Sequence, residues 1–488
     1  MASNSTENEI VLSLISHTNV GKTALARTLL REDVGEVADS AHVTVIPEAY
    51  LLIEKDGLIA RIWDTPGFGS NLAKLAKRLR SSDNPVGWIL HQVWDRAADK
   101  SLWCSQEAIR NVQSDADVVL YLVDASQPPE ALSYVDLEIE VIEWIKKPVV
   151  VFLNQTGEPN AEKDLRNESA WREHLAKFEI VKSVSTLDAF TRSWTQEHQI
   201  LEKAAEVLKG KKQKVAFKLR DAWIDRNVEI LDSAVDALAE LACFSLTDTE
   251  PIPKKGLIDK LTQLVNRKEH NKELELIQTR MYERLAERTS KIVNRLISIH
   301  GLDGETASEL SRVSREEFAV KRNVEESFLA TIGGAATGLV GGLSADLISG
   351  GMTFGGGAIV GMLLGGATTF ALAYGFNLTQ AGQNMVRWTE NHFRSQVQAM
   401  VMLYLAVSHF GRGRGSWKDP VNNPAKWESI LKDELEENAE VWNKLWKKGG
   451  IDSDPEKLKR DLEKAFRKLI SKVFVELYPD SAALFVRK

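Results

Sequence analysis

The sequence predicts two domains of different class: an α/β domain whose mostly parallel sheet has helices on both faces, followed by an all-helical domain. Apolar β-branched runs alternate with amphipathic stretches up to about residue 190, which is typical of an α/β domain. After about residue 195 the strand signal stops, and helical periodicity with dense charge pairing replaces it. One segment, residues 327–376, is far more apolar and glycine-rich than the rest.

The overall composition is that of a folded protein. The chain has 488 residues, of which 43% are hydrophobic and 27% charged, enough for a sizeable core. The formal net charge of −7 argues against a protein that coats nucleic acid. The two cysteines, Cys104 and Cys243, exclude a disulfide framework and form no zinc pattern. The first residues lack the basic and apolar regions of a signal peptide, so we expect a reducing, cytosol-facing location.

The expected N-terminal domain covers residues 1–190. Its predicted strands are residues 10–15, 49–53, 58–63, 118–123, 149–153 and, more weakly, 178–184. The second and third of them flank Asp56-Gly57, a dipeptide that suits a tight hairpin turn, whereas the continuous β-branched runs indicate parallel strands. A helical insertion is expected at about 71–112.

The expected helical domain covers residues 191–488. Its predicted helices are residues 195–245, 256–300, 306–326, 424–448 and 455–478. Between Glu326 and Arg387 only Asp346 is charged, and two apolar stretches, 328–345 and 352–374, approach the length that spans a bilayer.

Glycines recur every four residues in both apolar stretches, a spacing that lets helix backbones pack closely. They are Gly334, Gly338 and Gly342, then Gly357, Gly361 and Gly365. We therefore expect a glycine-zipper helical hairpin at about 327–376, inserted in a membrane with both ends on the cytoplasmic side. The alternative is a buried hairpin in the core of a soluble helical domain.

The clearest chemical signal is the sequence SHTNVGKT at residues 16–23, between a predicted strand and a predicted helix. Such a loop wraps phosphates with backbone N–H groups, while Lys22 reaches the β- and γ-phosphates and the Thr23 hydroxyl binds Mg²⁺. Ser16 stands where the usual pattern begins with glycine. The expected nucleotide-binding residues here are His17, Thr18, Asn19, Val20, Gly21, Lys22, Thr23 and Ala24. The alternative is a chance Gly-Lys-Thr at a helix start.

A second motif, Asp64-Thr-Pro-Gly67, follows the third-strand region of the sequence. An aspartate at a strand end can hold Mg²⁺ through water, and the glycine N–H can sense the γ-phosphate. Thr44 lies between the two motifs, where a switch threonine would complete the Mg²⁺ shell. The expected metal ligands are Thr23, Thr44 and Asp64, and Lys22, Thr44 and Gly67 are expected to take part in catalysis.

The order of these motifs, continued by Asn154-Gln-Thr-Gly157 and Ser183-Val-Ser185, resembles that of translation-factor-class P-loop GTPases, in particular the bacterial Era-like and TrmE-like groups. The whole chain is similar to bacterial proteins in which an uncharacterised helical domain follows an Era-like domain. The resemblance implies GTP and GDP binding, Mg²⁺-dependent hydrolysis, and contacts to the base from Asn154, Gln155 and Ser185. Because Gln155 and Gly157 depart from the Asn-Lys-x-Asp motif, guanine preference comes from the resemblance alone.

Phe68 follows Gly67 where Ras-like relatives place a glutamine. Some Era-like and TrmE-like GTPases use K⁺ instead, bound partly by a phosphate-loop asparagine, and Asn19 occupies that position here. A monovalent cation would supply the positive charge that phosphoryl transfer needs. The resemblance thus implies potassium-stimulated hydrolysis in which Asn19 takes part. The alternative is that Asn19 only makes hydrogen bonds within the loop.

Together these features predict a GTP-hydrolysing molecular switch associated with a lipid bilayer or a membrane protein, at the cytoplasmic face of the inner membrane. The first alternative is a soluble, cytoplasmic Era-like GTPase that acts on RNA or ribosomes. The second is a dynamin-like remodeller that self-associates, and the third is a scaffold that binds nucleotide without cleaving it.

Overall fold

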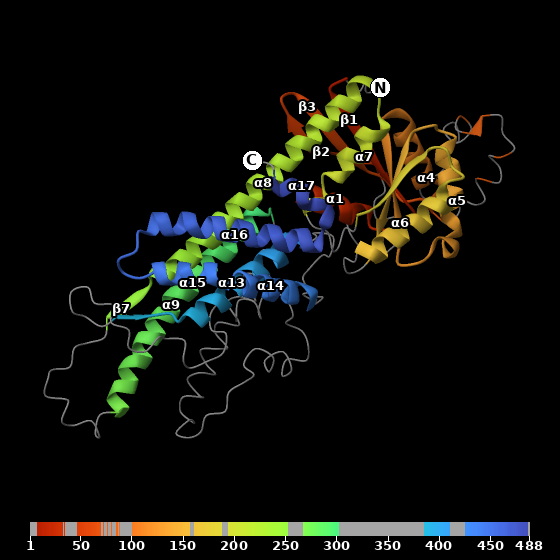
Figure 1. Ribbon diagram of the computed structural model, residues 1–488. Coiled ribbons are helices and arrows are strands. Elements are labelled where there is room, and N and C mark those ends of the chain that lie inside the picture. Colours follow the sequence, from red (N-terminus) through yellow and green to blue (C-terminus); the bar gives the residue numbers. More distant parts are fainter. Residues whose placement is uncertain are drawn as a thin grey trace. The chain divides into compact units, whose positions relative to one another are not determined.

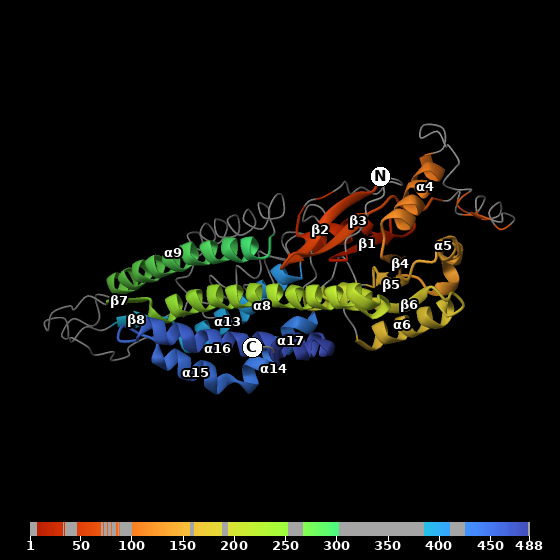
Figure 2. The ribbon, with the colours of Figure 1, turned by 90° about the horizontal axis from the view of Figure 1, so that it is seen from above.

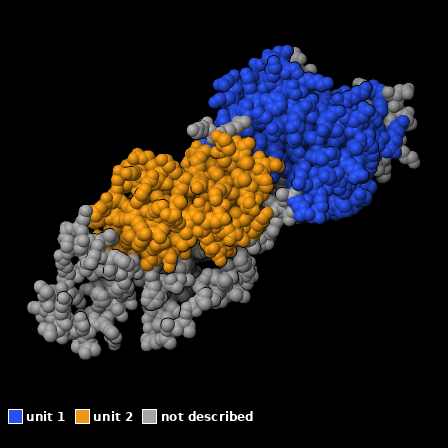
Figure 3. All heavy atoms as spheres, in the orientation of Figure 1, with its two compact units in different colours: residues 1–229, 409–415 blue, residues 230–408, 416–488 orange. Residues whose placement is uncertain are grey.

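The computed structural model describes residues 7–32, 34, 46–69, 100–156, 161–187, 194–251, 267–301, 385–409 and 425–486, with isolated positions between 72 and 87. The chain divides into two compact units (Figure 3): residues 1–229 with 409–415, and residues 230–408 with 416–488. The expected domain border near residue 190 stays a prediction.

The first unit, drawn in red to yellow in Figure 1, is built on a six-stranded sheet. Its strand order is β2-β3-β1-β4-β5-β6. The strands are β1 (Glu9–Ile15), β2 (Glu48–Lys55), β3 (Leu58–Asp64), β4 (Val118–Asp124), β5 (Val149–Asn154) and β6 (Val181–Thr186). Only β2 and β3 pair in antiparallel fashion; the other neighbours are parallel. The predicted mostly parallel sheet with one hairpin is therefore confirmed, and Asp56 and Gly57 make the hairpin turn with φ of 52° and 72°.

Helices cover both faces of this sheet. They are α1 (Lys22–Leu30), α4 (Lys100–Ser114), α5 (Ser133–Glu143), α6 (Ala161–Leu175) and α7 (Gln199–Val207), together with the start of α8 (Gly210–Thr247). One core layer joins the sheet to α1, α7 and the first part of α8, and the other joins it to α4, α5 and α6. Burial on both faces explains why β4 and β5 are apolar up to their last residue and why Ser13 is the only polar residue of β1 after Glu9.

The second unit is mainly helical. Its elements include the rest of α8, β7 (Thr249–Pro251), α9 (Arg267–Ile299), β8 (Met385–Arg387), α13 (Glu390–Ser408), α14 (Ala425–Glu437), α15 (Ala439–Lys448), α16 (Pro455–Leu477) and α17 (Ala482–Val486). Helix α16 packs against α14, α15 and α17, and α13 against α9, α14 and α15 (Figure 2). Trp442, which contacts Phe393 and Phe466, lies in its core at 1% exposure.

Two features of this unit differ from the sequence prediction. Strands β7 and β8 pair antiparallel after the point where the strand signal stops, and α13 occupies a stretch for which no helix was predicted. The predicted helix at 306–326, most of the insertion at 71–112 and the glycine-rich hairpin at 327–376 lie outside the described residues. Among the helices that are described, none combines the length and apolar character needed to span a bilayer.

Candidate functional site

The loop that joins β1 to α1 has the geometry of an anion-binding site. β1 ends at Ile15 and α1 begins at Lys22. Between them, Asn19 and Gly21 adopt left-handed backbone angles, with φ of 65° and 99°. Glycine and asparagine tolerate this region best, so the backbone curls and enters the helix directly. A curled backbone and a helix N-terminus both present N–H groups to an anion.

Lys22 is buried inside this loop. Its Nζ donates to Oγ of Ser16 at 2.9 Å and to the carbonyl of His17 at 3.2 Å. Burial lowers the pKa of Lys22 to about 8, although the carboxylates of Asp64 and Glu138 oppose the effect. A buried ammonium is stabilised by any anion that reaches it, so this position favours phosphate binding. Ser16, which replaces the usual glycine, supplies one of the acceptors that hold the ammonium.

Thr23 and Asp64, two of the three expected magnesium ligands, are in direct contact. Thr23 Oγ1 donates to Oδ2 of Asp64 at 2.6 Å, and Asp64 is buried at the end of β3. Thr44, the third expected ligand, lies outside the described residues. Within the described part of the chain, no cluster of three or more His, Cys, Asp or Glu side chains forms a metal site.

A hydroxyl and one carboxylate nevertheless suit Mg²⁺, which takes most of its ligands from water and phosphate oxygens. Thr23 and Asp64 would hold the ion beside the phosphates, where it neutralises charge on the transferred group. The protein's own part is to place these two oxygens next to the Lys22 ammonium.

The Gly67–Phe68 segment lies directly on the phosphate loop. The Phe68 N–H donates to the Ser16 carbonyl at 2.9 Å, and the Phe68 carbonyl accepts from the Thr18 N–H at 3.2 Å. A Cβ on Gly67 would lie 2.9 Å from Thr18 Cα and 3.0 Å from Lys22 Nζ, so only glycine fits this approach. The Phe68 side chain is buried in the core with Ile15 and Leu72 and brings no catalytic group to the site.

The loop after β5 is attached to the phosphate loop from the other side. Asn154 is fully buried, and its Nδ2 donates to the carbonyl of Val20 at 2.7 Å, with Gln155 Nε2 at 3.5 Å from the same oxygen. Gly157 lies outside the described residues. The expected base-contacting residues Asn154 and Gln155 are therefore beside the loop, and Asn154 also fixes its backbone.

The remaining expected site residues are placed as follows. Ser185 lies near the carboxyl end of β6, opposite Phe152 of β5, and is mostly buried. Ala24 is buried in the first turn of α1, whereas the side chain of Asn19 is exposed. The carboxyl ends of parallel strands are where ligands bind in α/β folds, and the site residues gather at that edge.

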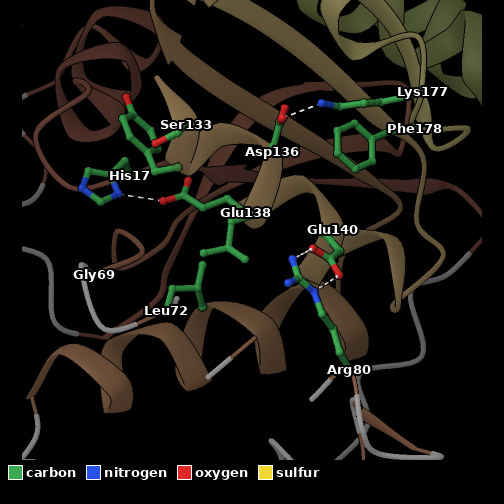
Figure 4. Close-up of a pocket in the computed structure, with 12 residues that line it drawn as sticks. His17, Gly69, Leu72, Arg80, Ser133, Asp136, Glu138, Glu140, Lys177 and Phe178 are labelled. Atoms are coloured by element: carbon green, nitrogen blue, oxygen red, sulfur yellow. Dashed lines mark hydrogen bonds and ion pairs between the residues drawn. The ribbon is translucent and has the colours of Figure 1, made fainter. Parts of the chain in front are cut away.

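The imidazole of His17 lines a cavity of about 550 Å³ beside α5 (Figure 4). Its Nδ1 lies 2.7 Å from Oε1 of Glu138, and its ring contacts that of Tyr134 in a tilted arrangement, with centroids 4.3 Å apart. The hydroxyl of Tyr121 donates to Oε2 of Glu138 at 2.6 Å. Burial raises the pKa of Glu138, while His17 and Tyr121 favour its charged form. The side chain of His17 is therefore engaged by α5, whereas its carbonyl accepts from the Lys22 ammonium.

Sequence reasoning missed Glu138, although a signal was present. Buried residues of α5 include Val135, Glu138, Ile139 and Ile142, which share the i, i+3, i+4, i+7 spacing of a core-facing stripe. A carboxylate in such a stripe is rarely buried without partners. Its partners, Tyr121 on β4 and His17 on the phosphate loop, become visible only when the sheet is assembled.

Comparison with known proteins agrees with this architecture. Residues 11–155 match the family described as 50S ribosome-binding GTPase, and residues 172–473 match a domain of unknown function, DUF3482. No curated protein matches the chain.

Two solved structures illustrate how distant the structural relatives are. An Era variant of Aquifex aeolicus with GDP and aluminium fluoride has 15% identity and a TM-score of 0.30, covering 57% of this chain and 88% of that one. An NFeoB variant of S. thermophilus with GMPPNP has 21% identity and a TM-score of 0.27, covering 60% of this chain and 97% of that one.

The match over 172–473 spans more than half of the chain, and the N-terminal match includes the phosphate loop, Asp64, Gly67 and Asn154. The chain belongs to the DUF3482 family, and its N-terminal domain is a P-loop GTPase domain that binds and hydrolyses GTP.

Proposed function

We propose that this GTPase is a switch that acts at a membrane, to which the glycine-rich segment at 327–376 attaches it on the cytoplasmic side. The observation that supports switching is the contact between Gly67 and the phosphate loop. Gly67 approaches Thr18 and Lys22 too closely for a side chain, and Phe68 pairs with the loop backbone. A γ-phosphate bound by Lys22 must share this space with Gly67, so nucleotide state changes the segment after it.

The membrane part of the proposal is supported by the sequence. A stretch with a single charge between Glu326 and Arg387, and glycines at four-residue spacing, suits close helix packing in lipid. A charge placed at the centre of such a stretch costs about 2.5–3.5 kcal/mol on insertion scales.

Flotation with vesicles of phosphatidylethanolamine and phosphatidylglycerol tests this proposal. We expect the full chain to float with the vesicles and to resist carbonate extraction, and Val360→Lys to reduce the floating fraction strongly. Leu276→Lys is the matched control, because Leu276 is 59% exposed on α9, and it should float like the wild type. Extraction of the wild type into buffer alone would reject membrane attachment.

We further propose that K⁺ stimulates hydrolysis through Asn19. Asn19 is exposed at the loop and holds a left-handed φ of 65°, and the position after Gly67 offers only a buried Phe68. Turnover should be several-fold faster in KCl than in NaCl at equal ionic strength, and Asn19→Ala should remove the difference. Equal rates of the wild type in both salts would reject the role of K⁺.

A second candidate function is binding to ribosomes or RNA without a membrane. The observation that favours it is the match of residues 11–155 to a family described as ribosome-binding. Co-sedimentation with ribosomes in the GTP-bound but not the GDP-bound state would support it. Nucleotide-dependent pelleting of the protein by itself would instead indicate self-assembly.

A further inference from the structure

Among the described residues around the phosphate loop, Glu138 is a buried carboxylate that GTP hydrolysis does not otherwise employ. It is 1% exposed and has two close partners, His17 at 2.7 Å and Tyr121 at 2.6 Å. Burying a carboxylate is unfavourable unless hydrogen bonds compensate. The arrangement therefore concentrates three polar groups at the point where α5 meets the loop.

His17 is the residue through which α5 can influence phosphate binding. Its side chain is held from α5, by Glu138 and by a tilted ring contact with Tyr134. Its carbonyl accepts from the Lys22 ammonium at 3.2 Å. Its backbone also forms a parallel bridge with Phe68, the residue after Gly67. A displacement of the His17 ring would thus move the His17 carbonyl, which accepts from Lys22. It would also move the backbone bridge between His17 and Phe68, the residue after Gly67.

We propose that Glu138 is a positioning residue for nucleotide binding, which acts by holding the His17 side chain and so fixes the phosphate loop around Lys22. The proposal rests on nucleotide binding by this loop and is independent of the membrane proposal. Figure 4 shows the His17–Glu138 contact. Glu140, two residues further along α5, pairs with Arg80 instead, so α5 does not hold the loop through its carboxylates in general.

The test is a double-mutant cycle on the affinity for a non-hydrolysable GTP analogue, with the full chain and Mg²⁺. Glu138→Gln keeps the shape of the side chain and removes its charge, and His17→Ala removes the ring. Each single change should weaken binding roughly tenfold, as expected for one charge-assisted hydrogen bond. The affinity of the double variant should be at most about threefold lower than that of whichever single variant binds the analogue less tightly, because both changes break the same contact.

Additive losses, roughly a hundredfold in the double variant, would overturn the proposal, since Glu138 would then act without His17. An affinity of Glu138→Gln within twofold of the wild type would also overturn it. Tyr121→Phe is the second variant in case His17→Ala does not fold: it removes one donor to the carboxylate and should weaken binding about threefold. An unchanged Tyr121→Phe affinity together with an unchanged Glu138→Gln affinity counts against the proposal.

Two further measurements separate positioning from a general loss of structure. Glu143→Gln alters another carboxylate of α5, one that is half-buried, and should leave the affinity and the kcat unchanged. In Glu138→Gln the KM for GTP should rise while kcat falls by less than twofold, because the catalytic groups remain. A wild-type protein that binds no nucleotide would overturn the loop assignment itself, whereas independent effects in a binding-competent protein would overturn only the role of Glu138.

Discussion

Lys22 illustrates how strongly a single side chain can depend on a ligand that it is built to hold. Its ammonium is buried among the oxygens of its own loop, and burial lowers its pKa to about 8. The charged form is therefore disfavoured without an anion and favoured with one. Loss of this side chain should affect nucleotide binding far more than folding.

We expect Lys22→Ala to weaken binding of GTP and GDP at least a hundredfold, because it removes the charge that meets the β- and γ-phosphates. Isothermal titration measures the affinities. The free energy of unfolding without nucleotide should fall by less than about 1 kcal/mol, since a desolvated charge is removed together with its hydrogen bonds. Lys55→Ala, at the exposed end of β2, is the control. Nucleotide affinity retained in Lys22→Ala would contradict the assignment of the loop.

Gly67→Ala should lower kcat for GTP at least tenfold while GDP affinity changes little. The new Cβ would lie 2.9 Å from Thr18 Cα, so the Gly67–Phe68 segment cannot keep its contact with the loop that receives the γ-phosphate. Single-turnover hydrolysis measures the effect.

Gly57→Ala is the matched control for this change. Gly57 has a positive φ of 72° and no atom within 4 Å of its added Cβ. It should lose about 1 kcal/mol of stability from backbone strain and keep its turnover. If Gly67→Ala hydrolyses GTP as fast as Gly57→Ala, the conformation of the segment after β3 does not respond to the γ-phosphate.

At the scale of elements, sequence periodicity predicted the long helices and the parallel strands but not the short pieces. Strands β7 and β8 have three residues each, and they pair Thr249 with Arg387. Three residues are too few to show a period, and their pairing depends on contacts far apart in the sequence. Helix α13 was missed because all but one of its residues from Gln396 to Val407 are buried, which leaves little amphipathic contrast.

His392 gives α13 a pH-dependent contribution to stability. Burial lowers the pKa of His392 to about 4. Its Nε2 lies 2.9 Å from Nε2 of Gln396, and its ring stacks on Trp388 with centroids 4.6 Å apart. The neutral imidazole accepts the Gln396 donor, so a proton on Nε2 would break this contact.

Because the pKa of His392 is lower in the folded than in the unfolded state, the unfolded state binds more protons between about pH 6.5 and pH 4. The contribution of His392 to the free energy of unfolding is therefore fully present above pH 6.5. It decreases by about 3 kcal/mol in total as the pH falls through this range. Denaturant unfolding at several pH values measures this slope. His392→Gln should make it shallower, and an unchanged slope in that variant would show that other groups cause it.

At the scale of the whole molecule, each of the two units has its own core. The first is organised around a sheet with apolar layers on both faces, and the second around aromatic residues such as Trp442 and Phe466. Nucleotide binds within the first unit, where the loop, Asp64 and Asn154 all lie. Bound nucleotide should therefore stabilise the first unit directly.

We expect Mg²⁺ and GDP at a hundred times the Kd to stabilise the N-terminal unit by about 2.7 kcal/mol through mass action. For a domain of this size the unfolding temperature should rise by about 5–10 °C. Differential scanning calorimetry measures the shift, and Lys22→Ala should show none at the same concentration. An equal shift in that variant would mean that the nucleotide binds elsewhere.

The fold class and the chemistry of the phosphate loop could be predicted from the amino-acid sequence, because both depend on local spacing. Alternating apolar runs specify strands and helices, and Lys22 and Thr23 follow Gly21 at the positions where phosphate and magnesium require them.

The contact between His17 and Glu138, in contrast, could be seen only in the folded protein. The two residues are 121 positions apart, and the contact exists because parallel strands bring the β1 loop, Tyr121 and α5 to one edge of the sheet. Whether a buried carboxylate has partners depends on such long-range packing, which a single sequence does not encode locally.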